Sequence, residues 1–223
     1  MSRVSVRMVA MMLTVLAATL ACQAGSGAGA AVPAPVVDEA KAAAKGKETA
    51  VVAGGCFWGI QAVFQHVKGV HSATAGYSGG TVKNPDYEMV SSGETGHAES
   101  VQIVYDPSQV TYGELLRVFF SVALDPTELN RQGPDRGTQY RSVIFYSNDE
   151  QKHIAEAYIA QLDQAKVYPR KIVTQVVPLQ AFYDAEDYHQ NYATIHPSDP
   201  YIVFNDAPKV ANLRKEFPEL YNK

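Results

Sequence analysis

The sequence contains very little cysteine, because Cys22 and Cys56 are the only two among its 223 residues. Beyond the N-terminal region a single thiol remains, and it has no partner for a disulfide relay within one domain. Together with scattered histidines, this scarcity argues against the cysteine-rich ligand sets of structural zinc sites. The sequence therefore predicts no metal site and no bound cofactor.

A run of apolar residues long enough to cross a bilayer is also missing. Residues 8–21 are uncharged and mostly apolar, follow Arg3 and Arg7, and have the length of a secretory signal core. We therefore expect residues 1–21 to be a signal peptide and the protein to be exported to the periplasm or cell envelope. Thr19-Leu20-Ala21-Cys22 resembles a lipoprotein cleavage box, which would lipidate Cys22. Ordinary cleavage nearby stays open as the alternative, and a lipid on Cys22 is the only membrane attachment we expect.

Excess positive charge is absent as well. The chain has 19 Lys and Arg against 23 Asp and Glu, a net charge of −4, and loss of Arg3 and Arg7 with the signal would leave 17 against 23, or −6. Such a balance argues against binding of nucleic acid or of an anionic membrane. Residues 22–46 are rich in Ala, Gly and Pro and lack aromatics, which predicts a flexible tether ahead of a folded domain at residues 47–223.

The folded domain mixes strand and helix patterns without a strict alternation, which favours an α+β fold. We expect a two-layer sandwich with a mixed β-sheet flanked by helices and long irregular loops. The tail after residue 192 contains four prolines and is expected to be irregular. Alternating apolar residues predict strands at residues 49–53, 71–77, 99–105, 139–146 and 172–177, and helical spacing predicts helices from about residue 56, at 112–123 and at 148–166.

Cys56 follows two glycines between an apolar strand pattern and a helix pattern, in Gly54-Gly55-Cys56-Phe57-Trp58-Gly59. The glycines allow a tight turn, so Cys56 should lie in the first turn of the helix. There the unpaired amides and the helix dipole favour a nucleophilic thiolate. Phe57 and Trp58, the only tryptophan in the chain, should place an apolar wall beside the sulfur. A buried structural cysteine is the plainer alternative.

Glu99 stands where a glycine-bearing loop enters a strand rich in Val and Ile. Partial burial there would raise the pKa of its carboxyl group and keep a proton available near neutral pH. An exposed strand carboxylate is an equally good interpretation of the local pattern. His97-Ala98-Glu99 also resembles part of a zinc deaminase motif, but the distal Pro-Cys-x-x-Cys that such enzymes need is absent.

Other polar segments carry weaker signals. Asp135 lies in a turn and taken alone is more simply a turn residue. Tyr87 and Tyr140 could be ordinary core or surface aromatics, although a phenol near a reacting centre can donate a hydrogen bond to a developing oxyanion. The segment Glu186–Tyr192 is dense in polar groups and resembles a solvated face.

Five motifs in register, however, resemble the A-type peptide methionine sulfoxide reductases. The resemblance covers about residues 49–192 and extends toward Tyr221, and Glu186-Asp187-Tyr188-His189-Gln190 adds to it. The five motifs are Gly55-Cys56-Phe57-Trp58-Gly59, Gly76-Tyr77-Ser78-Gly79-Gly80, Asn84-Pro85-Asp86-Tyr87, Gly96-His97-Ala98-Glu99 and the stretch from Gln132 to Ser142.

The resemblance implies reduction of the S epimer of methionine sulfoxide, free or in proteins, to methionine. It implies that Cys56 attacks the sulfoxide sulfur and that Glu99 protonates the sulfoxide oxygen, leaving a sulfenic acid on Cys56. The other matched residues hold the oxygen (Tyr87 and Tyr140), support the site (Asp135) or cage the substrate methyl group (Phe57 and Trp58).

One departure from the family concerns regeneration. Many members carry resolving cysteines near the C-terminus, whereas this chain has none after Cys56 and so resembles a one-cysteine subtype. We therefore expect an external thiol, from a thioredoxin-like protein or a small molecule, to restore Cys56 in a monomeric enzyme. Two other functions stay open at this point, a thiol peroxidase and a non-catalytic aromatic pocket for a cation.

Overall fold

The computed structural model describes residues 32–223. The predicted signal peptide and Cys22 lie outside the described residues. Within that range, no helix combines the length and the apolar character needed to cross a membrane.

A mixed β-sheet forms the centre of the described part of the chain. It has six strands in the order β7-β6-β1-β3-β2-β8, and all neighbours are antiparallel except β6 and β7. The predicted α+β class with a mixed sheet is confirmed. The strands are β1 (Glu48–Ala53), β2 (Val70–Ser78), β3 (Ala98–Tyr105), β6 (Val143–Tyr146), β7 (Gln175–Pro178) and β8 (Phe182–Asp184), and a separate ribbon pairs β4 (Arg131–Gln132) with β5 (Asp135–Arg136).

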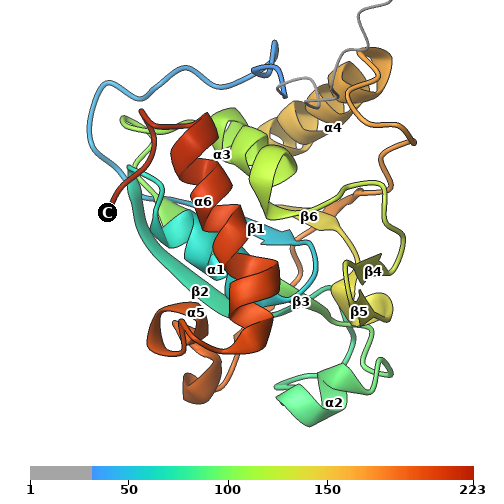
Figure 1. The fold of residues 1–223 in the computed structure, drawn as a ribbon. Coiled ribbons are helices and arrows are strands. Elements are labelled where there is room, and N and C mark those ends of the chain that lie inside the picture. Colours follow the sequence, from blue (N-terminus) through green and yellow to red (C-terminus); the bar gives the residue numbers. More distant parts are fainter. Residues whose placement is uncertain (1–31) are drawn as a thin grey trace, which may run out of the picture.

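Helices cover the sheet, as Figure 1 shows, with α6 crossing in front of α1. Thr111 begins α3 with a capping box, in which its hydroxyl accepts the amide of Glu114 and the Glu114 carboxylate accepts the amide of Thr111. The helices are α1 (Phe57–Gln65), α2 (Tyr87–Ser91), α3 (Tyr112–Val118), α4 (Asp149–Gln164), α5 (Tyr192–Ile195) and α6 (Ala207–Glu216), with π-helical turns at Phe119–Ala123 and Ile202–Asp206 and 3₁₀ turns at Thr138–Tyr140 and Asp187–His189.

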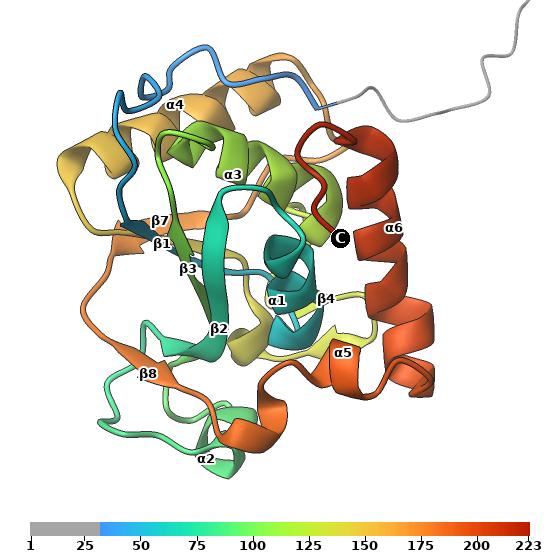
Figure 2. The same ribbon diagram turned by 90° about the vertical axis from the view of Figure 1, so that its left-hand side faces the viewer.

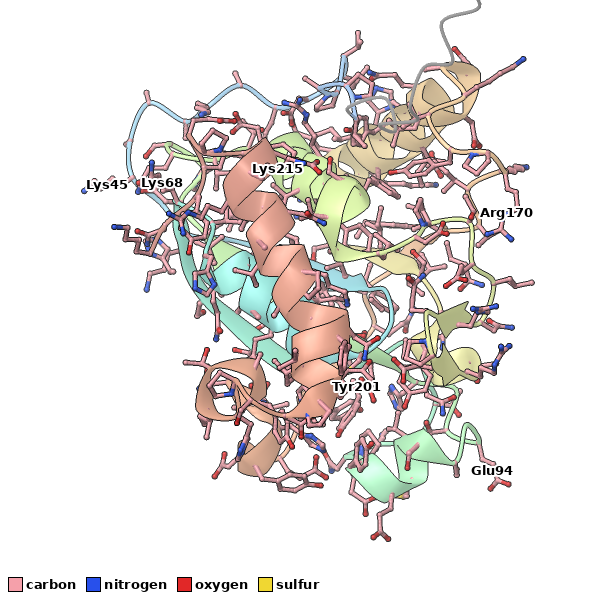
Figure 3. All side chains as sticks on the ribbon, viewed as in Figure 1. Lys45, Lys68, Glu94, Arg170, Tyr201 and Lys215 are labelled. Atoms are coloured by element: carbon pink, nitrogen blue, oxygen red, sulfur yellow. The ribbon has the colours of Figure 1, made fainter. Side chains whose placement is uncertain are left out.

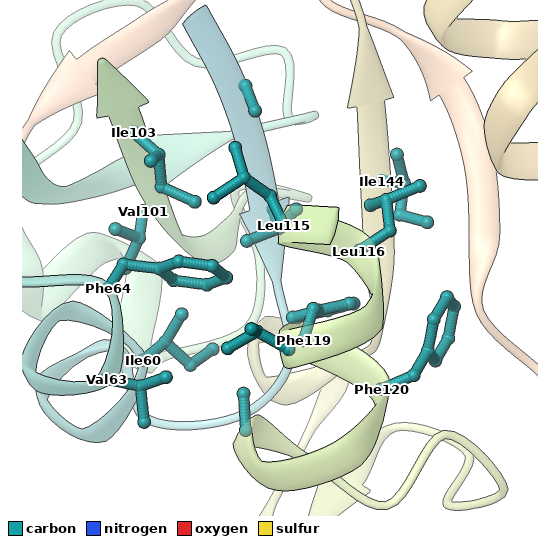
Figure 4. Close-up of a cluster of buried hydrophobic side chains, with 14 of the residues drawn as sticks. Ile60, Val63, Phe64, Val101, Ile103, Leu115, Leu116, Phe119, Phe120 and Ile144 are labelled. Carbon is teal, nitrogen blue, oxygen red and sulfur yellow. The ribbon is translucent and has the colours of Figure 1, made fainter. Parts of the chain in front are cut away.

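The main core lies between the sheet and the helices on one of its faces. Figure 4 shows side chains from α1, β3, β6 and the α3 region meeting there. A smaller apolar cluster around Val51 and Phe145 occupies the opposite face of β1 and β6. The main core fixes the start of α1, and therefore Cys56, relative to the sheet. The side chains labelled in that view are Ile60, Val63, Phe64, Val101, Ile103, Leu115, Leu116, Phe119, Phe120 and Ile144.

Residues 32–46 correct the prediction of a flexible tether. Figure 2 shows this blue segment lying across α4 and α3. Val32 is buried in the core, and the hydroxyl of Tyr158 donates to the carbonyl of Pro33 at 2.7 Å. Asp38 accepts the backbone amide of Gly113 at 2.8 Å and the hydroxyl of Thr111. The composition of the segment was misleading, because hydrogen bonds to the helices hold the segment in addition to its few buried apolar side chains.

The expectation of an irregular C-terminal tail is also wrong. Residues 202–216 form a π-helical turn followed by α6, which packs along α1. Pro208 occupies the first turn of α6, where proline is tolerated because the missing amide has no helical partner. Residues 81–95 contain the short helix α2, whose first turn is capped by Asp86.

Candidate active site

Cys56 lies at the turn that joins β1 to α1, at the N-terminal end of the helix as the sequence predicted. Gly55 has a φ of +95°, and a β-carbon there would lie 2.6 Å from Cβ of Gln132. Only glycine satisfies both the left-handed conformation and the close approach of β4. A glycine at position 55 is therefore required for the turn that places Cys56 at the start of α1.

The thiol of Cys56 is buried, with 8% of the residue exposed. Burial raises its pKa well above the ordinary value, and the carboxylates of Glu99 and Asp206 raise it further. A hydrogen bond from the Trp58 amide and the charge of Lys209 act in the opposite direction but do not outweigh burial. The predicted preference for a thiolate in the free protein is thus wrong, although the helix position that suggested it is correct.

Glu99, the second residue of β3, is almost completely buried, and its Oε2 atom accepts the backbone amide of Phe57 at 3.0 Å. Burial raises the pKa of its carboxyl group to about 8, while the Phe57 amide opposes that rise. Glu99 is consequently protonated near neutral pH, which favours the buried interpretation of Glu99 over the exposed strand carboxylate. Its hydrogen bond to the residue after Cys56 places the acid beside the thiol.

One pocket of about 220 Å³ brings together all seven side chains that the sequence singled out in the domain. An eighth lining residue, Tyr201, was missed because it comes from the tail, where the sequence offers no recognisable signal. In Figure 3 the labelled Tyr201 lies at the lower end of α6, on the side facing β5 and α2. The lining residues are Cys56, Phe57, Trp58, Tyr87, Glu99, Asp135, Tyr140 and Tyr201.

Three phenols, those of Tyr87, Tyr140 and Tyr201, line the pocket together with the apolar wall. Burial raises the pKa of Tyr87, Tyr140 and Tyr201, so each hydroxyl keeps its proton and can donate a hydrogen bond. The hydroxyl of Tyr201 donates to Oδ2 of Asp135 at 2.5 Å. Asp135 is therefore more than a turn residue, because it fixes a tyrosine from the tail against the pocket.

Trp58 is held by aromatic residues from the same tail region. Its ring stacks on Tyr192 with centroids 3.8 Å apart and an interplanar angle of 9°, and it meets Tyr201 edge-on at 5.9 Å. Its Nε1 atom donates to Nδ1 of His189 at 3.3 Å. Sequence reasoning identified Trp58 and the segment Glu186–Tyr192, but it did not predict that His189, Tyr192 and Tyr201 contact the indole.

A buried ion pair lies against the first turn of α1. Oδ1 of Asp206, a fully buried residue, accepts Nζ of Lys209 at 3.1 Å. Both atoms lie against Gly59, where a β-carbon would approach Oδ1 to 2.1 Å and Nζ to 2.8 Å. The pair brings one charge of each sign near Cys56. In sequence it is indistinguishable from an ordinary surface pair at i and i+3.

The arrangement suits proton-assisted attack by a thiol on a small apolar group that carries one oxygen. The pocket holds a nucleophile, a protonated acid, phenolic donors and an apolar wall. In residues 32–223, no cluster of three or more His, Cys, Asp or Glu side chains could hold a metal ion.

Comparison with known proteins identifies the family. A family model for peptide methionine sulfoxide reductase matches residues 48–221. The chain is 62% identical over 181 residues to the peptide methionine sulfoxide reductase MsrA 2 of Mesorhizobium japonicum, covering 81% of this chain and 93% of that protein. It is 50% identical over 190 residues to MsrA 2 of Synechocystis sp., covering 84% and 89% respectively.

Solved structures agree with this result. Methionine sulfoxide reductase A of Corynebacterium diphtheriae aligns with a TM-score of 0.60 at 38% identity, covering 69% of this chain and 77% of that one. The reduced form of Mxr1 from Saccharomyces cerevisiae aligns with a TM-score of 0.61 at 32% identity, covering 74% and 92%. These matches decide against a thiol peroxidase and against a non-catalytic binding module. The chain belongs to the peptide methionine sulfoxide reductase family, in its A type, and is an oxidoreductase that acts on methionine sulfoxide.

Proposed function

We propose that this enzyme reduces the S epimer of methionine sulfoxide, peptide-bound and free, with Cys56 as nucleophile and Glu99 as general acid. The observation that carries the proposal is the shared pocket, in which the thiol of Cys56 lies beside a carboxyl group whose pKa is about 8. Attack at a sulfoxide sulfur requires that the oxygen be protonated before it can leave, and Glu99 holds a proton for that purpose at neutral pH.

The chemical step transfers one oxygen atom and two electrons. The sulfur of Cys56 bonds to the sulfoxide sulfur while the proton of Glu99 passes to the sulfoxide oxygen. The resulting hydroxyl group then passes from the substrate sulfur to the sulfur of Cys56, as the sulfur–oxygen bond of the substrate and the new sulfur–sulfur bond both break. The products are methionine and a sulfenic acid on Cys56, and the thiol proton of Cys56 replaces the one that Glu99 gave up. The substrate sulfur is reduced and the sulfur of Cys56 is oxidised.

The remaining side chains of the pocket hold the substrate. Tyr87 and Tyr140 donate hydrogen bonds to the sulfoxide oxygen, and their raised pKa values keep those protons in place as negative charge develops. Phe57 and Trp58 enclose the methyl group on the apolar side. Asp135 supports the pocket through Tyr201.

Regeneration requires an external thiol. One thiol attacks the sulfenic acid, forming a mixed disulfide and water, and a second thiol releases Cys56 as a free thiol. This proposal is supported by the cysteine inventory, since Cys56 is the only cysteine in residues 32–223. A thioredoxin-fold dithiol protein supplies both thiols at once, whereas a small thiol must act twice.

We place this reaction outside the cytoplasm on the strength of the N-terminal residues. The basic start, the apolar stretch at residues 8–21 and the box ending at Cys22 support export to the periplasm or cell envelope, with Cys22 as the site of a lipid anchor. The substrates would then be oxidised exported proteins, repaired by a monomeric enzyme.

A single-turnover experiment tests the catalytic scheme. The mature protein with Cys22→Ser is mixed with methionine S-sulfoxide in the absence of reductant, and methionine and intact protein mass are measured. We expect one methionine per protein and a mass gain of one oxygen that disappears on addition of thiol. Cys56→Ser should form no methionine. Sustained turnover without any thiol would contradict the scheme.

A further inference from the structure

The segment Glu186–Tyr192, which resembles a solvated face in sequence, packs against residues that line the active-site pocket. The carboxylate of Glu186 accepts the hydroxyl of Tyr77 at 2.9 Å and the backbone amide of Tyr87 at 2.8 Å. Farther along, Nε2 of Gln61 donates to Oε1 of Gln190 at 2.9 Å. These bonds attach the segment to β2, α2 and α1 at once, so its residues have fixed positions relative to the pocket.

His189 is the buried residue of this segment, with 3% of it exposed. Its ring centroid lies 5.8 Å from that of Trp58, 5.1 Å from that of Phe57 and 4.4 Å from that of Tyr87, and all three of these residues line the pocket. His189 therefore contacts both the apolar wall and one of the phenols, and it separates the two.

The hydrogen bond with Trp58 determines the state of the His189 ring. An indole N–H can only donate, so Nδ1 accepts at 3.3 Å and the ring proton of the neutral form is on Nε2. Nε2 is buried without a hydrogen-bond partner. Burial lowers the pKa of His189, which favours this neutral form. A buried, unpaired N–H destabilises the fold, so packing alone does not explain a histidine here.

The hydrogen bond between Trp58 and His189 also restrains the indole ring in a way that stacking on Tyr192 does not. Tyr192 stacks on the face of Trp58, and stacked rings can slide and rotate within their common plane at little cost. A hydrogen bond to Nε1 is directional and fixes the indole within that plane.

We propose that His189 is a positioning residue that sets the separation between Trp58 and Tyr87, and thereby the size of the alkyl group that the pocket admits. This inference rests on the proposed function, because it concerns the group that Trp58 encloses. His189 does not touch the reacting atoms, and it acts through the indole ring.

The test uses the mature protein and three variants. His189→Leu removes the hydrogen-bond acceptor for Trp58 Nε1 and fills the space with an apolar side chain. His189→Asn places an acceptor oxygen near the position of Nδ1. His196→Leu is the matched control, because this exposed histidine of the same tail region contacts Tyr192 and not Trp58. Trp58 is the only tryptophan, so intrinsic fluorescence reports on its surroundings without interference from a second indole.

For His189→Leu we expect a shifted Trp58 emission maximum and a KM for a methyl sulfoxide raised about tenfold. The preference for methyl over ethyl sulfoxide should narrow by a similar factor, the size of effect that one methylene produces in an apolar pocket. The single-turnover rate at saturating substrate should change much less. His189→Asn and His196→Leu should stay within about twofold of the wild type in every measurement.

An unchanged emission maximum and an unchanged methyl-to-ethyl ratio in folded His189→Leu would overturn the proposal. Should circular dichroism show that this variant is unfolded, Trp58→Phe decides instead, because it lacks the indole N–H. The methyl-to-ethyl ratio of Trp58→Phe should then narrow as expected for His189→Leu, and an unchanged ratio would contradict action through the indole. Failure of the proposed function would be distinct, since the wild type would then not reduce the methyl sulfoxide while its fluorescence could still be compared.

Discussion

Cys56 and Glu99 lie in the same pocket, and burial acts on both in the same direction. It raises the pKa of the thiol and the pKa of the carboxyl group, so the free enzyme holds two protons side by side at neutral pH. A carboxylate at position 99 would repel a thiolate, and a protonated Glu99 removes that repulsion. The protonated Glu99 therefore supplies a proton for the leaving oxygen and also avoids repulsion of the Cys56 thiolate.

Glu99→Gln tests the acid. At neutral pH the variant should reduce methionine sulfoxide about 10²–10⁴-fold more slowly in a single turnover, because the amide cannot donate a proton comparably. The advantage of the wild type should be constant at lower pH and shrink as the pH rises through about 8, where Glu99 loses its proton. Rapid-quench measurement of both proteins across this range checks the prediction. A ratio independent of pH would remove Glu99 from the proton transfer.

The same variant tests the charge coupling between the two residues. Ionised Glu99 raises the pKa of the Cys56 thiol, so Glu99→Gln should move the pH midpoint of Cys56 alkylation to a lower value. The rate of reaction with iodoacetamide measures this midpoint when Cys22 is replaced by serine. A midpoint that stays the same, or rises, would contradict coupling between the two side chains.

Sequence motifs could predict the residues that carry the chemistry but not all of those that surround them. Cys56, Phe57 and Trp58 are adjacent in the chain, and Glu99 lies in a recognisable strand, so local pattern and family resemblance find them. Tyr201 reaches the pocket because the tail folds back over α1, and His189 packs against Trp58 because its segment is hydrogen-bonded to β2, α2 and α1. No local signal indicates either placement. The pKa of Cys56 shows a second limit, because a helix start is visible in sequence whereas the depth of burial is not.

At the scale of elements, α6 illustrates how proline can be misinterpreted. Four prolines in the tail suggested irregular structure, yet Pro208 begins a helix that packs along α1. The contact depends on Gly59, which has no side chain where Asp206 and Lys209 approach α1. The strands of the sheet were more predictable, because the apolar clusters packed against the sheet impose a local pattern of apolar residues on them.

The ion pair of Asp206 and Lys209, which lies where α6 packs against α1, leads to a prediction about stability. Lys209→Met leaves the carboxylate of Asp206 buried without its cation and should reduce the free energy of unfolding by about 3–5 kcal/mol. Urea denaturation measures the change. The double variant Asp206→Asn with Lys209→Met should be less destabilised than Lys209→Met alone, because the uncompensated charge is gone. Equal losses in the two proteins would show that the charge is not the cause.

At the scale of the whole molecule, the N-terminal segment closes the structure over α3 and α4. Its composition predicted a tether because composition shows only how much apolar surface a segment can bury, and not which hydrogen bonds its polar groups make. Asp38 and Glu39 instead accept the backbone amides at the start of α3, which have no partner within the helix. The folded unit thus includes residues 32–46 and does not begin near residue 47.

Asp38→Ala should reduce the free energy of unfolding by about 1.5–3 kcal/mol, the range for a hydrogen bond to a charged group. Chemical denaturation of the mature protein measures the change. Val36→Ala is the matched control, because Val36 lies on the same segment with 84% of it exposed, and it should change stability by no more than about 0.5 kcal/mol. Identical midpoints for Asp38→Ala and Val36→Ala would mean that the segment adds nothing to stability.

The docked segment also limits how far the enzyme can work from a membrane. In the lipid-anchored form proposed above, only residues 23–31 separate the anchor from the folded unit. A polypeptide spans at most about 3.5 Å per residue, so the separation is at most about 30 Å, whereas a free chain up to residue 46 would have reached roughly 80 Å. Such an enzyme would act only on substrates within a thin layer next to the bilayer. Oxidised methionines of membrane-bound and membrane-adjacent proteins would be repaired first, and soluble proteins only as they diffuse into that layer.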